Sequence, residues 1–183
     1  MPAGLSYQPD VLSADEERAV LEELDRLEFD EIRMHGVAAK RTAKHLGFEY
    51  DYEHRGLVAD AEPMPHWLQP VREKAALLAG VRPEQLVEVL VQRSPEGAQI
   101  GWHRDAPMFG TIVGISLLSS ARMRFRLATD KRQTAELELQ PRSGYVLADE
   151  ARTKWQHHLP PVKSLRYSIT FRTLRHPERY RPS

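Results

Sequence analysis

The chain of 183 residues contains no cysteine. This absence excludes disulfide bonds, thiolate metal sites and cysteine nucleophiles, and it favours a reducing compartment. No apolar run approaches the roughly 18–20 residues that a membrane-spanning helix needs. The first residues also lack the basic segment and apolar stretch of a secretory signal. We therefore expect a cytoplasmic protein, without a membrane partner, that exists as a monomer.

Net charge is also absent, because 26 Lys and Arg balance 26 Asp and Glu. The signs are nevertheless unevenly distributed. Residues 1–35 hold ten acidic against three basic residues, and residues 151–183 hold eight basic residues against Glu178. A basic end suits a polyanionic partner. The alternative is a solvated tail plus a few arginines with internal roles, so charge alone does not establish nucleic-acid binding.

Two helices are predicted in the N-terminal half. Ser13 followed by Glu16 is a capping box ahead of an apolar pattern, so the first helix is expected over about residues 14–28. The second pattern opens after Pro63 and is closed by Gly80. The length suits one domain with a substantial core, and we expect the whole chain to form it.

The remaining elements are predicted to be strands. Residues 33–62 are polar and basic with scattered aromatics, which is typical of short strands and loops. After residue 85 the apolar pattern changes to that of strands, predicted over residues 86–92, 111–118, 123–127, 135–139, 145–147 and 165–171. Short strands separated by turns favour a sandwich or barrel. We predict a mainly β (α+β) fold, a jelly roll or double-stranded β-helix supported by the N-terminal helices.

The first informative segment for chemistry is 101–105, Gly-Trp-His-Arg-Asp. Side chains two apart on an extended segment share a face, so His103 and Asp105 converge. A third ligand from the downstream pair His157 and His158 would complete a two-His, one-carboxylate set, which suits iron(II) and leaves coordination positions open. Alone, the H-x-D pattern is also that of an ordinary surface His–Asp pair.

The strand over residues 166–172 carries two arginines on one face. With a period of two, the side chains on that face are Arg166, Ser168, Thr170 and Arg172. Buried arginines are costly unless each meets an anion. A dicarboxylate cosubstrate would supply one anion and Asp105 the other, because the guanidinium fork matches a carboxylate. The alternative is an exposed face whose arginines contact only water.

These segments together resemble the AlkB family of 2-oxoglutarate oxygenases. The resemblance runs from about residue 40 to 174 and rests on residues 90–105, Arg152, His157 and the strand 166–172. It implies an iron(II)- and 2-oxoglutarate-dependent dioxygenase that consumes O2. His103, Asp105 and His157 match the family's iron ligands, and His157 is preferred to His158 from its place in the motif.

The resemblance also implies a cosubstrate site. Arg166 matches the arginine that binds the far carboxylate of 2-oxoglutarate, with Ser168 as a polar helper. Arg172 matches the arginine near the metal-proximal carboxylate and the liganding Asp105, with which we expect it to pair.

The sequence departs from the family pattern at two places. The family usually carries Asn and Tyr, two residues apart, as cosubstrate contacts, where this chain has Gln92 and Ser94. Gln92 can donate as Asn does, but Ser94 is too short to replace a phenol, so a water or another residue, such as Tyr145, must fill the gap. Base-reading members tend to carry an acidic residue at the position of Pro107, so reading of a methylated base from there is not predicted.

Residues 36–62 are similar to the lid that covers nucleotides in AlkB proteins. Basic side chains there would meet phosphates and aromatic ones would stack on a flipped base. The alternative is a strand pair with ordinary surface charges, and the aromatics beside the metal site are pocket wall or core. The predicted substrate contacts are Arg41, Phe48, Tyr50, Trp102 and Phe109.

The leading functional prediction is oxidative demethylation of alkylated nucleic acid, in DNA repair or RNA modification, with methylated single-stranded DNA or RNA as the partner. One alternative is a hydroxylase or demethylase of a protein side chain, which Pro107 and the zero net charge favour. Another is a non-catalytic jelly-roll binding module, which Ser94 favours.

Overall fold

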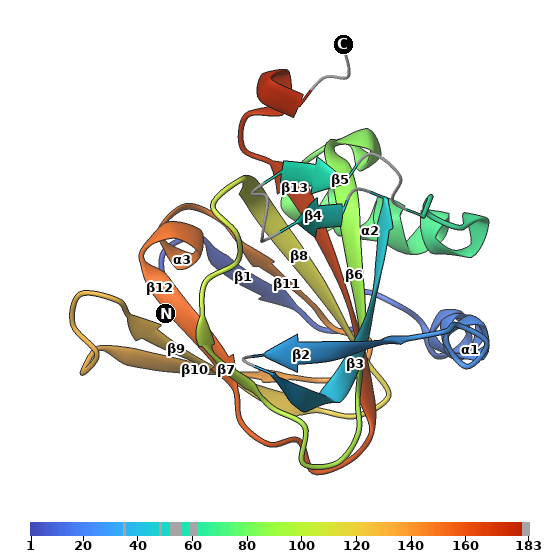
Figure 1. Cartoon of the computed structure of the whole chain (residues 1–183), viewed down its shortest axis with the longest axis horizontal. Coiled ribbons are helices and arrows are strands. Elements are labelled where there is room, and N and C mark those ends of the chain that lie inside the picture. Colours follow the sequence, from blue (N-terminus) through green and yellow to red (C-terminus); the bar gives the residue numbers. More distant parts are fainter. Residues whose placement is uncertain (35, 48, 52–55, 59–61, 181–183) are drawn as a thin grey trace.

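The strands of the protein form two main sheets (Figure 1). The structure is a computed structural model that describes residues 1–34, 36–47, 49–51, 56–58 and 62–180. Its strands are β1 (Leu5–Gln8), β2 (Asp30–Met34), β3 (Val37–Gly47), β4 (Glu49–Asp51), β5 (Gly56–Val58), β6 (Leu86–Ser94), β7 (Ile100–His103), β8 (Phe109–Leu117), β9 (Ala121–Leu127), β10 (Thr134–Leu139), β11 (Gly144–Leu147), β12 (Trp155–Leu159) and β13 (Arg166–Leu174). The major sheet has the order β1-β11-β8-β13-β6-β3-β2 and the minor sheet the order β10-β9-β12-β7, while β4 pairs with β5.

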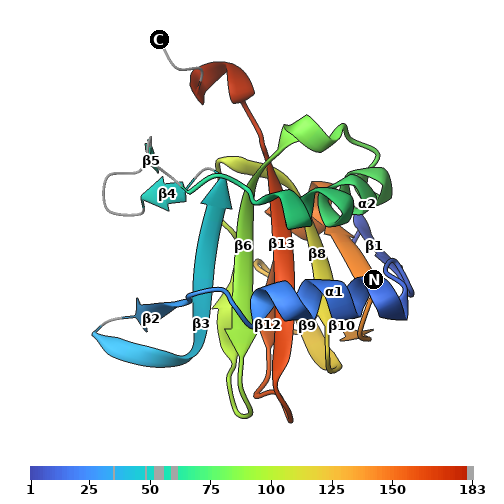
Figure 2. The same ribbon diagram turned by 90° about the vertical axis from the view of Figure 1, so that its right-hand side faces the viewer.

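Two helices cover the outer face of the major sheet (Figure 2). The helical elements are α1 (Ala14–Leu24), α2 (Gln69–Ala79) and α3 (Asp149–Thr153), with short 3-10 turns at His66–Leu68, Pro83–Gln85 and Pro177–Tyr180. Within the described part of the chain, these helices are too short or too polar to cross a membrane.

The strands β6 to β13 build a jelly roll. In chain order, β6, β8, β11 and β13 lie in the major sheet, whereas β7, β9, β10 and β12 lie in the minor sheet. The chain therefore passes repeatedly between the two sheets, and neighbouring strands pair antiparallel. This is a double-stranded β-helix, and the predicted fold class is confirmed.

Two apolar clusters fill the spaces on either side of the major sheet. One lies between this sheet and the helices α1 and α2, and it includes Ile169 and Phe171 of β13. The other lies between the two sheets and includes Phe125. Because side chains alternate along a strand, the remaining face of β13 turns toward the minor sheet. The arginines of β13 therefore share one face, as predicted, and this face points between the sheets.

The first helix is shorter than predicted. Its capping box is present, with Glu16 N donating to Ser13 Oγ at 3.1 Å. The helix ends at Leu24 and not near residue 28, because the backbone amides of Arg26 and Leu27 bond to carbonyls three residues back. Leu27 still packs against the core, so its apolar character extended the apparent helical pattern.

The segment 33–62 contains a longer strand than the predicted short strands and loops. β3 is eleven residues long and pairs with both β6 and β2. Only Ala43 and Leu46 of this strand are buried, which explains the weak apolar alternation in its sequence. Residues 37–47 of the predicted lid thus belong to the major sheet. The covering role of 36–62 stays a prediction, as do the limits of the domain.

Candidate metal centre and cosubstrate cavity

Three potential metal ligands meet between the two sheets. One ligand atom each from His103, Asp105 and His157 lies within 4.8 Å of the other two. The imidazole centroids of His103 and His157 are 4.2 Å apart, and His157 Nε2 lies 3.9 Å from Asp105 Oδ2. Two imidazoles and one carboxylate are a donor set that fits iron(II).

Strand pairing explains why these residues converge. In the minor sheet, His157 of β12 lies directly opposite His103 of β7, so both imidazoles point to the same side. Asp105 follows two residues later in the loop after β7. The predicted convergence of the three residues is therefore what the fold produces.

The neighbouring His158 faces the other way. Its Nδ1 lies 2.7 Å from the carbonyl oxygen of Ile100, and its ring lies 4.9 Å from the Trp102 ring. His157, in contrast, is 7% exposed and points at Asp105. Alternation along β12 thus selects His157 as the inward imidazole.

The His103 ring is fixed by its own chain. Nδ1 lies 2.8 Å from the carbonyl oxygen of Gly101, and that contact requires the Nδ1–H tautomer. The lone pair is then on Nε2, the nitrogen left to bind a metal. Metal-binding histidines commonly donate their other N–H in this way.

The protonation states in the cluster suit metal binding. Burial, followed by the neighbouring His103, lowers the pKa of His157 to about 3. Burial raises the pKa of Asp105, but Arg172 and the two histidines outweigh it and hold that pKa well below its usual range. Near neutral pH the cluster therefore offers a free imidazole lone pair and an ionised carboxylate, the forms that bind a metal ion.

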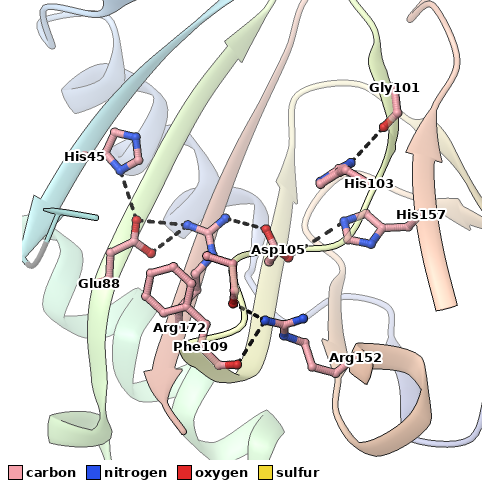
Figure 3. Close-up of polar contacts among 10 residues, drawn as sticks. His45, Glu88, Gly101, His103, Asp105, Phe109, Arg152, His157 and Arg172 are labelled. Carbon is pink, nitrogen blue, oxygen red and sulfur yellow. Dashed lines mark hydrogen bonds and ion pairs between the residues drawn. The ribbon is translucent and has the colours of Figure 1, made fainter. Parts of the chain in front are cut away.

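Asp105 is held by a chain of buried charges (Figure 3). Arg172 Nη2 donates to Asp105 Oδ1 at 3.0 Å, as predicted. The Nη1 of the same guanidinium donates to both carboxylate oxygens of Glu88, at 3.0 and 2.7 Å. Glu88 is 1% exposed and also lies 3.1 Å from His45 Nδ1. Arg172 is thus fixed between two carboxylates.

A second arginine shapes the loop that carries Asp105. Arg152 is buried, and its Nη2 donates to the backbone carbonyls of Ala106 and Phe109 (Figure 3). These bonds connect α3 to both ends of the segment that follows Asp105. The loop is therefore supported from outside the minor sheet.

A cavity of about 170 Å³ adjoins the cluster. Residues of both sheets line it. In the major sheet, strand alternation turns one face of β6 and of β13 toward the cavity. Its polar lining is formed by Arg41, Gln92, His103, Asp105, Tyr145, His157, Arg166, Ser168, Thr170 and Arg172. The structure thus brings the predicted residues Gln92 and Ser168 together with both arginines. Ser94 is buried opposite Arg166 but does not line the cavity.

Arg166 is a buried cation that has no anionic neighbour in the described part of the chain. It is 2% exposed, and burial lowers its pKa to about 10. Its Nη2 donates to Ser116 Oγ at 2.9 Å, and its Nε has no partner within the described chain. Among the described residues no carboxylate forms an ion pair with it. A buried guanidinium in this state suits an anionic ligand, and the cavity provides the space.

The predicted substrate contacts have mixed outcomes. Arg41 lines the cavity and bonds to the carbonyl of Gln99 at 3.1 Å. Trp102 alternates with His103 on β7 and lies under the Arg126 guanidinium, away from this cavity, so its contact with a substrate stays a prediction. Phe109 is 2% exposed and packs beneath Arg172, which agrees with the core alternative, and its contact with a substrate stays a prediction. Phe48 and the Tyr50 side chain lie outside the described residues.

Glu88 and the structural role of Arg152 were missed from the sequence. Glu88 interrupts the apolar run Leu-Val-Glu-Val-Leu-Val and is in phase with Gln92. A lone carboxylate in such a strand predicts a buried partner, and that signal was available. The carbonyl contacts of Arg152 depend on a loop conformation, which left no pattern in the sequence.

Sequence comparisons agree with this geometry. The profile of a family described as "2OG-Fe(II) oxygenase superfamily" matches residues 4–172. A protein named "Alkylated DNA repair protein ALKBH8 homolog" from Arabidopsis thaliana is 27% identical over 95% of this chain. The mouse protein named "tRNA (carboxymethyluridine(34)-5-O)-methyltransferase ALKBH8" is 27% identical over 89% of it. The chain spans only 59% and 25% of the lengths of these relatives.

Solved structures share the fold. The structure of OsALKBH1 superposes with a TM-score of 0.71, covering 93% of this chain and 98% of that one at 15% identity. A prolyl-4-hydroxylase from Pseudomonas putida gives a TM-score of 0.63, covering 94% and 92% at 19% identity. At these identities the likeness concerns the arrangement of the strands.

Proposed function

Because the chain belongs to the 2OG-Fe(II) oxygenase superfamily, with AlkB-type relatives, we propose that His103, Asp105 and His157 bind its iron(II). The protein is a 2-oxoglutarate-dependent dioxygenase, which uses iron(II), 2-oxoglutarate and O2. We assign the far carboxylate of 2-oxoglutarate to Arg166. Arg172, Gln92 and Ser168 complete the polar lining of the cosubstrate cavity.

The observation that carries this assignment is the buried Arg166. Its guanidinium faces the same cavity as the three ligands and has no carboxylate partner among the described residues. A dicarboxylate that reaches from the metal to Arg166 would neutralise it with a charge-assisted, bidentate contact. The neutral phenol of Tyr145, the Gln92 amide and the hydroxyls of Ser168 and Thr170 are further polar groups in the cavity lining.

The chain's own residues orient the reaction. Bound iron(II) supplies the oxidation of a substrate C–H bond by O2, coupled to decarboxylation of 2-oxoglutarate to succinate. Arg172 fixes the Asp105 rotamer, and Gly101 fixes the His103 tautomer. The apolar side chains Leu90, Met123 and Leu159 line the cavity and limit access of water.

We propose alkylated nucleic acid as the substrate, with oxidative N-demethylation in DNA repair or RNA modification as the outcome. Hydroxylation of an N-methyl group releases formaldehyde and leaves the unmodified base. The names of the two curated relatives refer to alkylated DNA and to tRNA. Arg41 is a half-buried cation in the cavity lining, and its Nε has no partner among the residues that the structure describes, so it is suited to a phosphate. We also assign residues 36–62 as the covering segment.

Mass spectrometry of methylated oligonucleotides tests this proposal. The protein would be loaded with iron(II) without oxygen and then exposed to O2 and 2-oxoglutarate. We expect succinate and a substrate that has lost one CH2. Absence of succinate under every condition would rule out the dioxygenase assignment and would favour a binding module. Succinate without any change in the oligonucleotides would reject the nucleic-acid substrate alone.

A protein side chain is the second candidate substrate. Pro107, exposed in the turn after Asp105, occupies the place of an acidic residue in base-reading AlkB proteins. Affinity for a single-stranded oligonucleotide separates the candidates, because phosphate contacts weaken steeply with salt. A salt-independent affinity would favour the protein substrate. Cytoplasmic location and the monomeric state stay predictions.

A further inference from the structure

Tyr145 reaches into the cavity across a neighbouring strand. It lies on β11 directly opposite Gly114 of β8, and it is 8% exposed. A Cβ built on Gly114 would lie 2.2 Å from Tyr145 Cζ and 2.5 Å from its hydroxyl oxygen. The phenol ring therefore crosses directly above Gly114. Any larger residue there would displace it.

The crossing brings the hydroxyl to β13. Gly114 pairs on its other side with Thr170, so a ring above Gly114 points from β11 toward β13. The Tyr145 hydroxyl is within hydrogen-bonding reach of Thr170 and interacts electrostatically with Arg166. Arg166 and Thr170 share the inward face of β13 with Ser168 between them. The phenol and the buried guanidinium therefore line the same cavity and interact electrostatically.

The phenol is a hydrogen-bond donor in this place. Burial, followed by the charge of Asp105, raises the pKa of Tyr145 to about 12. The hydroxyl therefore keeps its proton over the physiological range. A neutral phenol next to a guanidinium offers a second donor to a carboxylate that approaches Arg166.

On the β6 side of Arg166, the residue directly opposite is too short to reach the cavity. Ser94 of β6 lies opposite Arg166 in the sheet, but it does not line the cavity. A serine at this position leaves a gap that a longer side chain would fill. Tyr145, which approaches from β11, provides a polar group from the other side of β13.

We propose that Tyr145 completes the cosubstrate site, where its hydroxyl donates to the carboxylate held by Arg166 and its ring sets the length of the keto acid that fits. This inference rests on the proposed binding of 2-oxoglutarate at Arg166. It assigns a binding and length-selecting role to a residue separated from the strand of Ser94 by two other strands, and it makes Gly114 a requirement of that role.

The first test is cosubstrate binding without turnover. Calorimetry with manganese(II) in place of iron(II) gives the Kd of 2-oxoglutarate. For Tyr145→Phe we expect a rise of about 10- to 100-fold, as for loss of a hydrogen bond to a charged group, with manganese affinity unchanged. The control is Tyr7→Phe, the cross-strand neighbour whose hydroxyl accepts from Gln140 N outside the cavity. An unchanged Kd for Tyr145→Phe, or an equal rise in Tyr7→Phe, overturns the hydroxyl's role.

The second test is selectivity for chain length. In Tyr145→Ala we expect the Kd of 2-oxoadipate, which is one CH2 longer, to improve by about fourfold relative to that of 2-oxoglutarate. Burial of one CH2 is worth about that much when space exists for it. Gly114→Ala, which displaces the ring but keeps the hydroxyl, should weaken 2-oxoglutarate as Tyr145→Phe does. An unchanged ratio overturns the length-selecting role. Failure of the unaltered protein to bind 2-oxoglutarate at all would instead refute the proposed function.

Discussion

Two consecutive histidines of β12 have opposite surroundings. His157 faces Asp105 between the sheets, whereas His158 packs on Trp102 outside the minor sheet. This difference follows from the period of a strand and provides an internal control for the metal assignment.

His103→Ala and His157→Ala are expected to abolish 2-oxoglutarate decarboxylation, because each removes one of three ligands. His158→Ala should retain most of the activity. Succinate release measures the effect, and circular dichroism checks that each variant is folded. Normal turnover in either of the first two variants, or its loss in His158→Ala alone, contradicts the ligand set.

Arg166→Met is expected to abolish cosubstrate binding and to stabilise the ligand-free protein. The substitution keeps much of the side-chain volume and removes a buried cation that lacks an anion, so the free energy of unfolding should rise by about 1 kcal/mol or more. Urea unfolding measures this change. The matched control, Arg122→Met on the exposed face of β9, should change it by less than about 0.5 kcal/mol. A strongly destabilised Arg166→Met would mean that the guanidinium already has an anionic partner.

At the scale of elements, local sequence signals predicted most of the jelly roll. The capping box at Ser13 and the alternation of β9 and β13 act within a few residues, so they are visible without the fold. β1 and α3 went unpredicted, because a four-residue strand and a five-residue helix are defined by pairing and packing with distant segments. The end of α1 was missed for the same reason.

Those parts of the site whose residues lie on one extended segment were predictable from the sequence. His103, Asp105 and the inward side of β13 follow from a spacing of two. The same alternation predicts that Trp102, the neighbour of His103 on β7, points to the opposite face of the strand, away from the metal ligands. By contrast, the crossing of Tyr145 over Gly114 joins two strands 31 positions apart, and no local pattern shows which residue will lie opposite a glycine.

The strand β6 contributes a buried carboxylate whose loss should be costly. Glu88→Gln removes the charge between Arg172 and His45, and breaking a buried pair in this way typically destabilises by about 3–5 kcal/mol. Glu138→Gln, an exposed carboxylate on β10, is the control. Thermal unfolding should show the difference. If Glu88→Gln unfolds like its control, the buried pair does not stabilise the strand.

At the scale of the whole molecule, the charges between the sheets predict an acid-sensitive metal-free protein. The pKa of His157 falls from 6.5 to about 3 on folding, so the unfolded chain binds more protons between these values. Stability is then fully present above about pH 6.5 and decreases as pH falls toward 3, by at most about 1.4 kcal/mol per pH unit. The lowered pKa of Asp105 acts in the same direction at more acidic pH. Urea unfolding from pH 7 to 4 should show this slope, and His157→Ala should reduce it; equal slopes in both proteins would contradict the assignment.

The cavity is lined by side chains from both sheets. The potential metal ligands belong to β7, its following loop and β12, while the two arginines belong to β13. Small molecules bound in the cavity would contact both sheets, which otherwise pack against each other mainly through apolar side chains. At a thousandfold excess over Kd, such binding adds about 4 kcal/mol to stability. Protease digestion should therefore slow most when manganese(II) and 2-oxoglutarate are added together, and equal rates with and without them would refute the connection. In a cell, the lifetime of this protein would then follow the supply of iron and of a central carbon metabolite.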